Sequence, residues 1–213
     1  MKITILITDF NHPIVPYIRD WINTKTSEFS IDLINNKDKI SGGDILFLVS
    51  CHEYISKQER DMYKKTLLIH ASDLPKGRGW SPHIWSIIEG NSQITICLLD
   101  AEDKIDTGDI YKKIKIEIDS HELWYEINDK LFKAELELMD YAISFFETLK
   151  ASKQKPDSNH VYYLKRTPED SILDPNESIK NQFNKLRIMD PDRYPAYFLM
   201  NGHKYKLTIK KYE

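Results

Sequence analysis

The chain is poor in cysteine, which limits the metal and disulfide chemistry that it can carry. Two cysteines, Cys51 and Cys97, stand in 213 residues, and each adjoins an apolar run. We expect both to be buried free thiols, because two cysteines cannot complete a structural zinc site and a disulfide is unusual in a cytosolic chain. His52, His70 and His83 are scattered rather than grouped, so the sequence indicates no metal site.

Glycine is also scarce, with seven residues, and the phosphate-binding loops that depend on it are absent. No Gly-x-Gly-x-x-Gly follows the first apolar run, which leads instead into residues 8–11, and no Walker motif occurs. These absences exclude a dinucleotide site of the usual kind and a P-loop.

An excess of positive charge and a long apolar run are missing as well. Thirty Lys and Arg residues face 33 Asp and Glu residues, so the net charge is -3, which argues against tRNA or DNA as the main partner. The apolar run at residues 3–7 is too short for a signal-peptide core or a membrane helix. We therefore expect a cytoplasmic protein with no nucleic-acid or membrane partner.

What the chain does contain is a regular alternation of short apolar runs and amphipathic segments. Continuous apolar strands separated by helices favour a parallel sheet that is covered on both faces. The pattern predicts an α/β fold with a Rossmann-like, mostly parallel sheet and helices on both faces. The expected strands are 3–7, 29–34, 45–49, 67–69, 94–99 and 111–118, with helices at 13–22 and 82–89.

A long helix is the clearest single element, over residues 120 to about 150. Asp119 and Glu122 form a capping-box pattern before it. Apolar residues recur at three- and four-residue spacing, which predicts a buried stripe with a scaffold role. The stripe consists of Leu123, Ile127, Leu131, Ala134, Leu138, Tyr141, Phe145 and Leu149.

The polar segment 150–160, which holds Pro156, reads as a linker to a small C-terminal part. That part is expected to be an α+β appendage with a strand at 161–164, a helix at 178–188 capped by Ser178, and a β-hairpin. Asn201-Gly202 is a preferred type I′ pair and places the hairpin turn between residues 196–200 and 203–209. The sequence therefore predicts two domains, 1–150 and 151–213.

Two polar side chains follow buried strands in the larger domain. His70 ends the run 67–69 and begins a loop with Pro75, Gly77 and Gly79, and Asp106 lies in the loop after the run 94–99. Ligands bind beyond the carboxyl ends of parallel strands, so we expect both side chains at that edge. An imidazole beside a carboxylate can move a proton at neutral pH, which makes an enzyme the leading hypothesis.

Residues 67–110 resemble the signature of the 10-formyltetrahydrofolate-dependent formyltransferases. The family pattern is roughly Asn-x-His-x-Ser-x-Leu-Pro-x-x-x-Gly, then a helix, then Leu-Asp-x-Gly-Asp-Ile. Residues 166–172 resemble a motif that follows the catalytic domain in the tRNA and sugar branches of the family. The matching residues are His70, Ser72, Leu74, Pro75, Gly79 and Pro82, then Asp106, Thr107, Gly108, Asp109 and Ile110.

The resemblance implies a mechanism and a set of binding residues. An amine would attack the formyl carbon of 10-formyltetrahydrofolate, His70 would move the amine proton, and Asp106 would orient His70 and stabilise its imidazolium. No metal is implied. The folate pocket would be formed by His52, Tyr54, Ile55, Ala101, Glu102, Asp103, Ile105 and Asp106.

Basic and aromatic residues near the histidine are candidate substrate contacts. Lys76 and Arg78 either hold a phosphate or are solvated, and Trp80 either stacks on substrate or packs the short helix that follows. Arg166 and Asp170 are expected to form an ion pair that docks the C-terminal part.

One departure from the family pattern concerns the residue that donates a hydrogen bond to the oxyanion formed at the formyl carbon. The family asparagine two residues before the histidine is Leu68 in this chain. Loss of one such donor costs about 10²-fold or more in rate. Ser72, His52, Ser50 and a protonated His70 are the candidate replacements, and the sequence leaves the choice open.

The substrate is expected to be a small molecule. The residues after 150 are too few for the RNA-binding domain of the tRNA branch, and the loop 70–82 resembles sugar N-formyltransferases of the pseudaminic-acid type. The expected acceptor is a nucleotide-linked amino-deoxy sugar used for surface polysaccharide. Two alternatives remain, a glycinamide ribonucleotide formyltransferase and, because of Leu68, a non-catalytic folate- or sugar-binding homologue. An oligomer is compatible with the sequence.

Overall fold

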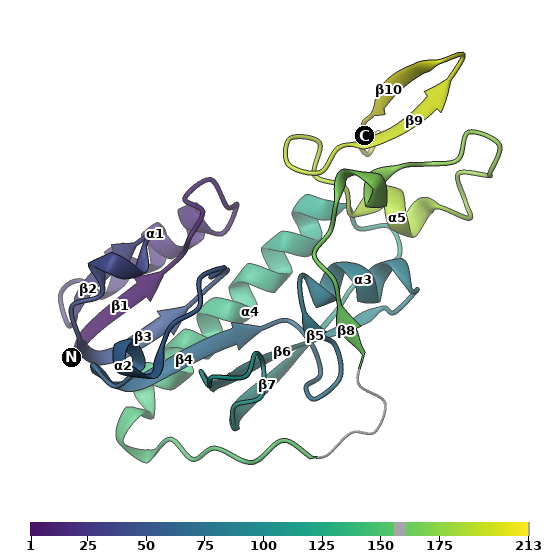
Figure 1. The fold of residues 1–213 in the computed structure, drawn as a ribbon. Coiled ribbons are helices and arrows are strands. Elements are labelled where there is room, and N and C mark those ends of the chain that lie inside the picture. The colour runs from purple at the N-terminus through teal and green to yellow at the C-terminus, as the bar shows by residue number, and fades with distance from the viewer. Residues whose placement is uncertain (156–160, 213) are drawn as a thin grey trace.

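The computed structural model describes residues 1–155 and 161–212, and its centre is a six-stranded sheet (Figure 1). The first four strands in the order pair in parallel, whereas β6 is antiparallel to β4 and β7 is antiparallel to β6. The predicted α/β, mostly parallel sheet is thus confirmed, with an antiparallel edge that the sequence did not reveal. In spatial order the strands are β2 (Ser30–Ile34), β1 (Lys2–Leu6), β3 (Gly43–Leu48), β4 (Tyr63–His70), β6 (Gln93–Asp100) and β7 (Ile110–Glu117).

Helices cover both faces of the sheet, but unequally. Helices α1 (Val15–Lys25) and α4 (Trp124–Ser144) pack together on one face, over the main apolar core. The other face carries the short α2 (Lys57–Arg60) and the 3-10 turn η1 (Lys37–Lys39) around a smaller core. Successive residues of a strand alternate between these two faces, so each strand contributes side chains to both cores.

The long helix is real but shorter at both ends than its periodicity predicts. The carboxylate of Glu122 accepts a hydrogen bond from the Asp119 N–H at 2.8 Å, yet the helix begins four residues later, where Glu126 accepts from the Leu123 N–H at 2.9 Å. The helix ends at Ser144 and a 3-10 turn, η2 (Phe146–Thr148), follows. The predicted stripe is buried through Leu138, whereas Phe145 is exposed because it lies past the helix end.

The C-terminal part differs from its prediction in helix length. The helix expected at 178–188 is reduced to α5 (Phe183–Arg187), and residues 179–182 form turns. The Ser178 hydroxyl still accepts from the Asn181 N–H, as a cap does. The hairpin of β9 (Ala196–Met200) and β10 (His203–Leu207) is confirmed. Its turn residues both have positive φ, as a type I′ turn requires. In Figure 1 the hairpin projects away from the sheet at the yellow end of the chain.

Four short elements lie where the two parts of the chain meet. Strand β5 (Arg78–Gly79) pairs in parallel with β8 (Tyr162–Tyr163), which occupies the middle of the strand predicted at 161–164. Helix α3 (Pro82–Ile88) follows β5, and η3 (Pro168–Ser171) follows β8. Part of the predicted linker, 156–160, lies outside the described residues.

Both cysteines are free, with Cys97 buried and Cys51 half-buried, as expected. Burial raises the pKa of each thiol to about 11, so neither is a ready nucleophile. None of the described helices is long and apolar enough to cross a membrane. Over residues 1–155 and 161–212, no group of three or more His, Cys, Asp or Glu side chains could hold a metal ion.

Candidate active site

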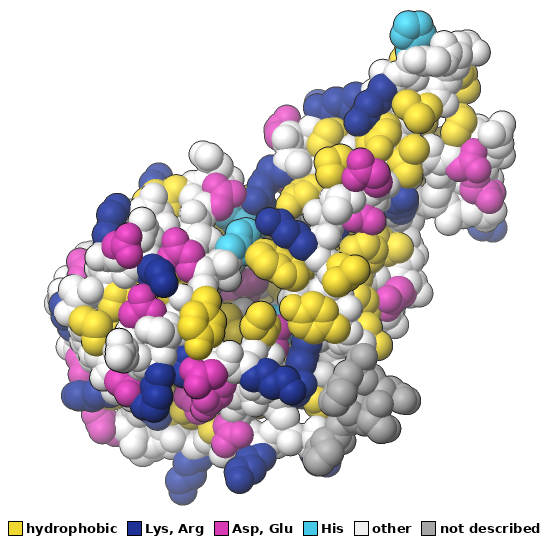
Figure 2. All heavy atoms as spheres, in the orientation of Figure 1, with side chains coloured by type: hydrophobic (Ala, Val, Ile, Leu, Met, Phe, Trp, Pro, Cys, Tyr) yellow, Lys and Arg dark blue, Asp and Glu magenta, His cyan; other side chains and the backbone are white. Residues whose placement is uncertain are grey.

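A cavity of about 410 Å³ opens at the carboxyl edge of the parallel strands. In Figure 2 it is the hollow near the centre of the molecule, bordered by hydrophobic side chains with basic residues close by. Its walls come from the ends of β3 and β4, the loop 101–106, the start of α3, one face of α4, and the C-terminal segments 162–166 and 188–194. Both parts of the chain therefore contribute to one site.

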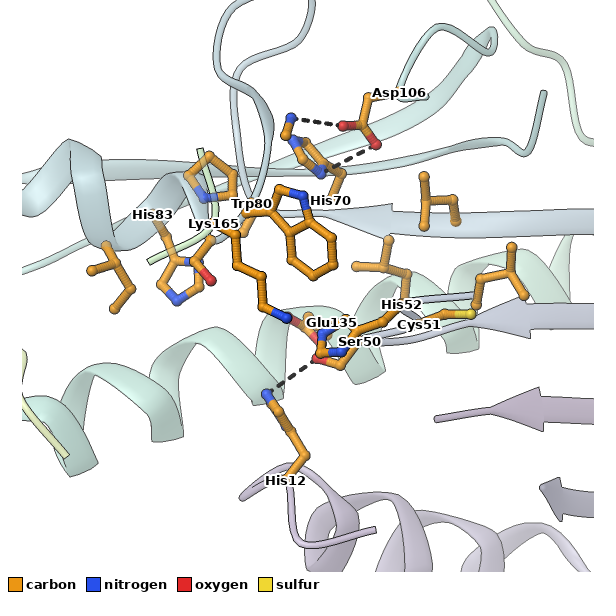
Figure 3. A pocket seen from close by; sticks show the side chains of 18 of the residues that line it. His12, Ser50, Cys51, His52, His70, Trp80, His83, Asp106, Glu135 and Lys165 are labelled. Carbon is orange, nitrogen blue, oxygen red and sulfur yellow. Dashed lines mark hydrogen bonds and ion pairs between the residues drawn. The ribbon is translucent and has the colours of Figure 1, made fainter. Parts of the chain in front are cut away.

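The predicted pair, His70 and Asp106, meets in this cavity (Figure 3). The imidazole Nδ1 lies 3.5 Å from Asp106 Oδ1, and Nε2 lies 2.9 Å from the carbonyl oxygen of Gly77. The other carboxylate oxygen, Oδ2, accepts a hydrogen bond from the Gly79 N–H at 2.9 Å. Because a carbonyl oxygen only accepts, Nε2 carries a ring proton, and Nδ1, which faces Asp106, is the nitrogen that can take up a second one.

The route by which Asp106 reaches His70 differs from the prediction. Strand β6 runs antiparallel to β4, so its carboxyl end pairs with Leu67 rather than with the edge where His70 lies. Asp106 arrives instead through the loop between β6 and β7, and its φ of 56° is the left-handed conformation that non-glycine residues rarely adopt. An observed backbone outlier of this kind points to a functional constraint.

The loop around Asp106 is held by two features. A Cβ on Gly108 would lie 1.9 Å from the Asp100 carbonyl oxygen, so only glycine fits there. Gln154 donates from Nε2 to the carbonyl oxygens of Asp106 and Gly108 at 2.8 and 2.9 Å, and its Oε1 accepts from Arg78 at 2.9 Å. Sequence reasoning missed Gln154, because it lies in a segment that reads as a polar linker.

Successive strand residues point to opposite faces of the sheet, which divides the cavity wall into two halves. The first half lies on the face of His70, and the second half lies on the face of α4. Ile69 and Ala71 pack toward α4, whereas Leu68 belongs to the apolar clusters on the opposite face. His70 follows Leu68 by two residues and shares its face. Figure 3 shows the same division, with His70 and Asp106 on one side of β4 and Glu135 on the side of α4.

Most of the residues predicted to bind folate line the first half of the cavity. Tyr54 and Ile105 are large apolar side chains that are 58% and 57% exposed at its lip, which leaves room for a flat ligand to cover them. Arg60 was not foreseen, and its guanidinium fixes this wall through the Ile55 carbonyl and Asp103, both at 2.6 Å. The predicted residues on the wall are His52, Tyr54, Ile55, Ala101, Glu102, Asp103, Ile105 and Asp106.

The other predicted residues divide between cavity and surroundings. Trp80 lines the cavity, with its ring centroid 4.9 Å from that of His52. Ser72 does not line it, and its buried hydroxyl has no partner among the described residues. Lys76 is exposed outside the cavity, and Arg78 turns toward Gln154.

Ser50 and His12 form a polar pair in the second half of the cavity. The Ile14 N–H donates to His12 Nδ1 at 3.3 Å, so Nε2 carries the ring proton and donates to Ser50 Oγ at 3.2 Å. Burial lowers the pKa of His12 to about 4, with help from the Arg193 charge, so the ring is neutral at pH 7. The Ser50 hydroxyl proton therefore remains free for a ligand. Ser50 also has a strained φ of 45°.

Glu135 is a second polar group that the sequence did not single out. It lies on the cavity face of α4, and no described residue forms a hydrogen bond or an ion pair with it. Burial raises the pKa of its carboxyl group to about 8. The sequence did not single out Glu135 because it lies within an apolar helical stripe. Only the packed structure shows which side of that stripe opens to the cavity.

Glu135→Gln is expected to stabilise the protein in a pH-dependent way. The carboxyl group stays protonated in the folded chain while the unfolded chain ionises, so the stability of the wild type falls between about pH 4.5 and 8. The gain of the variant should grow across this window to a few kcal/mol and stay constant above it. Thermal unfolding across pH measures it, with Glu137→Gln on the exposed face of α4 as the control. A gain that does not change with pH contradicts the burial of Glu135.

The predicted ion pair between Arg166 and Asp170 is wrong. Asp170 accepts instead from the Thr167 N–H at 2.6 Å and caps η3, because the local turn presents that donor first. The Arg166 guanidinium lies 4.6 Å from the ring centroid of Tyr194 and donates to Ser171 Oγ at 3.3 Å. Arg166 is thus a buried cation on the cavity wall that pairs with no described carboxylate.

Comparison with known proteins yields one family. Residues 4–143 match the family model described as Formyl transferase. A methionyl-tRNA formyltransferase from Protochlamydia amoebophila is 30% identical over 79% of this chain and 54% of its own length. The chain spans about half to two thirds of the length of such curated relatives.

Solved structures with the same fold come from several branches. A methionyl-tRNA formyltransferase from Clostridium thermocellum superposes with a TM-score of 0.83 at 20% identity, covering 100% of this chain and 94% of that one. HypX from Aquifex aeolicus, in complex with tetrahydrofolic acid, gives 0.80 at 21%, covering 98% and 37%. A 4-N formyltransferase from Francisella tularensis gives 0.72 at 20%, covering 100% and 98%.

Proposed function

Because this chain belongs to the formyl transferase family, we propose that it moves a formyl group from 10-formyltetrahydrofolate to the amine of a nucleotide-linked amino-deoxy sugar. The observation that carries the proposal is the His70–Asp106 pair, held at 3.5 Å inside a cavity with two differently lined halves. One half suits a folate and the other suits a polar acceptor, so the two reactants would meet at the edge of β4.

The first half of the cavity has apolar side chains and backbone hydrogen-bonding groups that fit a folate. Apolar side chains from β3 and β4, Leu48 and Leu68, form its floor, and the exposed Tyr54 and Ile105 form its lip. Loop backbone at 101–106 offers hydrogen-bonding groups that match the polar edge of a pteridine. When bound, 10-formyltetrahydrofolate supplies a formyl carbon that an amine can attack.

The proton steps are assigned to His70 and Asp106. His70 takes the proton that the amine loses as it forms the new carbon–nitrogen bond, and returns a proton to the folate nitrogen that leaves. Asp106 faces Nδ1 and stabilises the imidazolium between these two transfers. The Gly77 carbonyl holds Nε2 and fixes the ring orientation. No proton is lost to solvent in this cycle.

Ser50 is proposed as the donor to the formyl oxygen as negative charge develops there. Ser50 follows the end of β3, the strand that pairs with β4, and it lines the same cavity as His70. Its hydroxyl proton is free because the His12 Nε2–H occupies an acceptor position of Oγ. His52 is the second candidate. Its ring lines the cavity and is tilted by 54° against the ring of Trp80.

The chemistry of the cavity favours a sugar acceptor. The acceptor half presents a carboxyl group, Glu135, and a guanidinium, Arg166, neither of which forms an ion pair with a described residue. A nucleotide-linked amino sugar carries both the hydrogen-bond donors and the anionic group that these residues suit. The sequence of the loop 70–82 is the support for a pseudaminic-acid type and a role in surface polysaccharide.

The test is an assay of tetrahydrofolate release with a panel of amines. Purified protein is incubated with 10-formyltetrahydrofolate and with UDP- or dTDP-linked amino sugars, glycinamide ribonucleotide, or methionyl-tRNA. We expect release only with a nucleotide-linked amino sugar. Turnover with glycinamide ribonucleotide selects the purine alternative, and normal folate binding without turnover on any amine selects a non-catalytic binding protein.

Gln154→Leu is expected to lower kcat about 10- to 100-fold, because it removes the side chain that holds the Asp106 loop. If Gln154 acts by positioning Asp106, the same change should have little further effect in an Asp106→Asn background. Steady-state kinetics of the two single variants and the double variant measure this coupling. The exposed neighbour provides the control, Lys153→Ala. Losses that multiply in the double variant contradict the positioning role.

A further inference from the structure

Arg166 is the one residue of the sequence motif 166–172 that faces the cavity. Its side chain is 8% exposed, and its Nε and Nη1 donate to no described residue. Arginine is almost never this buried unless it is paired, because an unpaired buried charge is costly. A guanidinium kept in this state indicates that its counter-ion comes from a ligand.

The surroundings of Arg166 leave its charge uncompensated. His83 lies nearby with a buried Nδ1 that has no partner, and burial together with the charges around it lowers its pKa to about 3, so it is neutral. Arg193 lies on the same side of the cavity, but Asp9 neutralises it at 2.9 Å. The ring of Tyr194 supplies an aromatic face rather than negative charge. Asp170 acts on Arg166 only through its charge at longer range, so no described carboxylate forms an ion pair with this guanidinium.

A second cation without a described ion-pair partner stands at the cavity mouth. Lys165 precedes Arg166, lines the same cavity, and holds its Nζ 5.0 Å from the Trp80 ring centroid. Figure 3 shows its side chain extending past Trp80 toward Ser50 and Glu135. A buried fork-shaped guanidinium and an exposed ammonium that line the same cavity are a combination that suits a phosphate.

We propose that Arg166 and Lys165 form an anion subsite that binds the phosphate or diphosphate group of the acceptor substrate. Anion binding does not depend on formyl transfer, although naming the ligand as the acceptor rests on the proposed function. The carboxylates of the folate tail are the other source of anionic groups in this cavity. Arg166 lies on the C-terminal wall, away from the loop 101–106 where the folate is placed, which favours the acceptor.

The test measures thermal unfolding of the full chain with inorganic pyrophosphate, UDP, uridine or tetrahydrofolate. Ligand at about 100 times its Kd should raise the Tm of a chain of this size by roughly 5–10 °C. We expect this rise with pyrophosphate and with UDP, and none with uridine. Arg166→Met should abolish the rise, and its own Tm should be no lower than that of the wild type, because an unpaired buried charge is removed.

Two further variants keep the proposal falsifiable if Arg166→Met does not fold. Lys165→Ala changes an exposed side chain and should reduce the affinity for pyrophosphate several-fold. Arg166→Lys keeps the charge, loses the fork, and should bind more weakly than the wild type. Lys180→Ala, exposed and outside the cavity, should retain the full rise.

Four results overturn the proposal. They are no rise with pyrophosphate or UDP in the wild type, an unchanged rise in the Arg166 and Lys165 variants, a full rise with uridine alone, and a loss confined to tetrahydrofolate. The last result assigns Arg166 to the folate tail. A chain that binds pyrophosphate through Arg166 but formylates no amine leaves the subsite intact and removes the proposed function.

Discussion

His70→Ala is expected to abolish formyl transfer, lowering kcat by about 10³-fold or more, while the protein still folds and binds tetrahydrofolate. Positioned proton transfer contributes about 10²–10⁴-fold to rate. Asp106 Oδ2 accepts from the Gly79 N–H, and the other carboxylate oxygen, Oδ1, faces His70. Its ring packs at the end of β4 rather than in the main core, so its loss removes chemistry more than stability.

The measurement for His70→Ala is single-turnover formyl transfer, with thermal unfolding as the check on folding. His203→Ala, in the exposed hairpin, is the matched control and should retain full activity. Near-normal turnover of the His70 variant would remove this residue from the mechanism.

Ser50→Ala is expected to lower kcat about 10²-fold with little change in KM. A donor that strengthens its hydrogen bond only as charge develops stabilises the transition state and not the bound substrate. The structure leaves the Ser50 hydroxyl proton uncommitted in the cavity that His70 also lines, which is the basis of the expectation. Steady-state kinetics with the preferred acceptor measure kcat and KM separately.

Leu68→Asn is expected to restore activity to the Ser50→Ala variant. Position 68 shares the face of His70 in β4, where the family pattern has an asparagine, and an amide there can donate to the same oxygen. Leu68→Met, which adds no donor, serves as the control. A normal kcat in Ser50→Ala shifts the role to His52, and a loss in Ser50→Ala that Leu68→Asn does not repair contradicts the exchange of donors between positions 50 and 68.

The Arg166 subsite connects these expectations to the choice of acceptor. If the phosphate of the acceptor is fixed at Arg166, variants of Ser50 and His70 should change kcat and leave the binding of the acceptor nearly intact. Substrates that lack a phosphate should lose both binding and rate, because remote binding energy helps to orient the reacting amine.

The linear pattern of the chain determined much of the fold. Apolar runs located four of the six sheet strands closely, since a buried strand is apolar over most of its length. They gave only residues 67–69 of β4, because its first half contains Lys64, Lys65 and Thr66. The alternation over β7, the stripe of α4 and the Asn201-Gly202 turn were equally readable, because each depends on neighbouring residues. His70 and Asp106 were found in the same way, from loop composition and from their resemblance to a family.

Tertiary structure alone decided the direction of β6, and with it the way Asp106 reaches His70. It also brought Gln154, Glu135 and Arg166 to the site from a linker, a helical stripe and a C-terminal motif. The physical reason is that strand direction, unpaired burial and long-range hydrogen bonds depend on partners far away in sequence. Local spacing determined which residues could do chemistry, and packing determined which of them share one cavity.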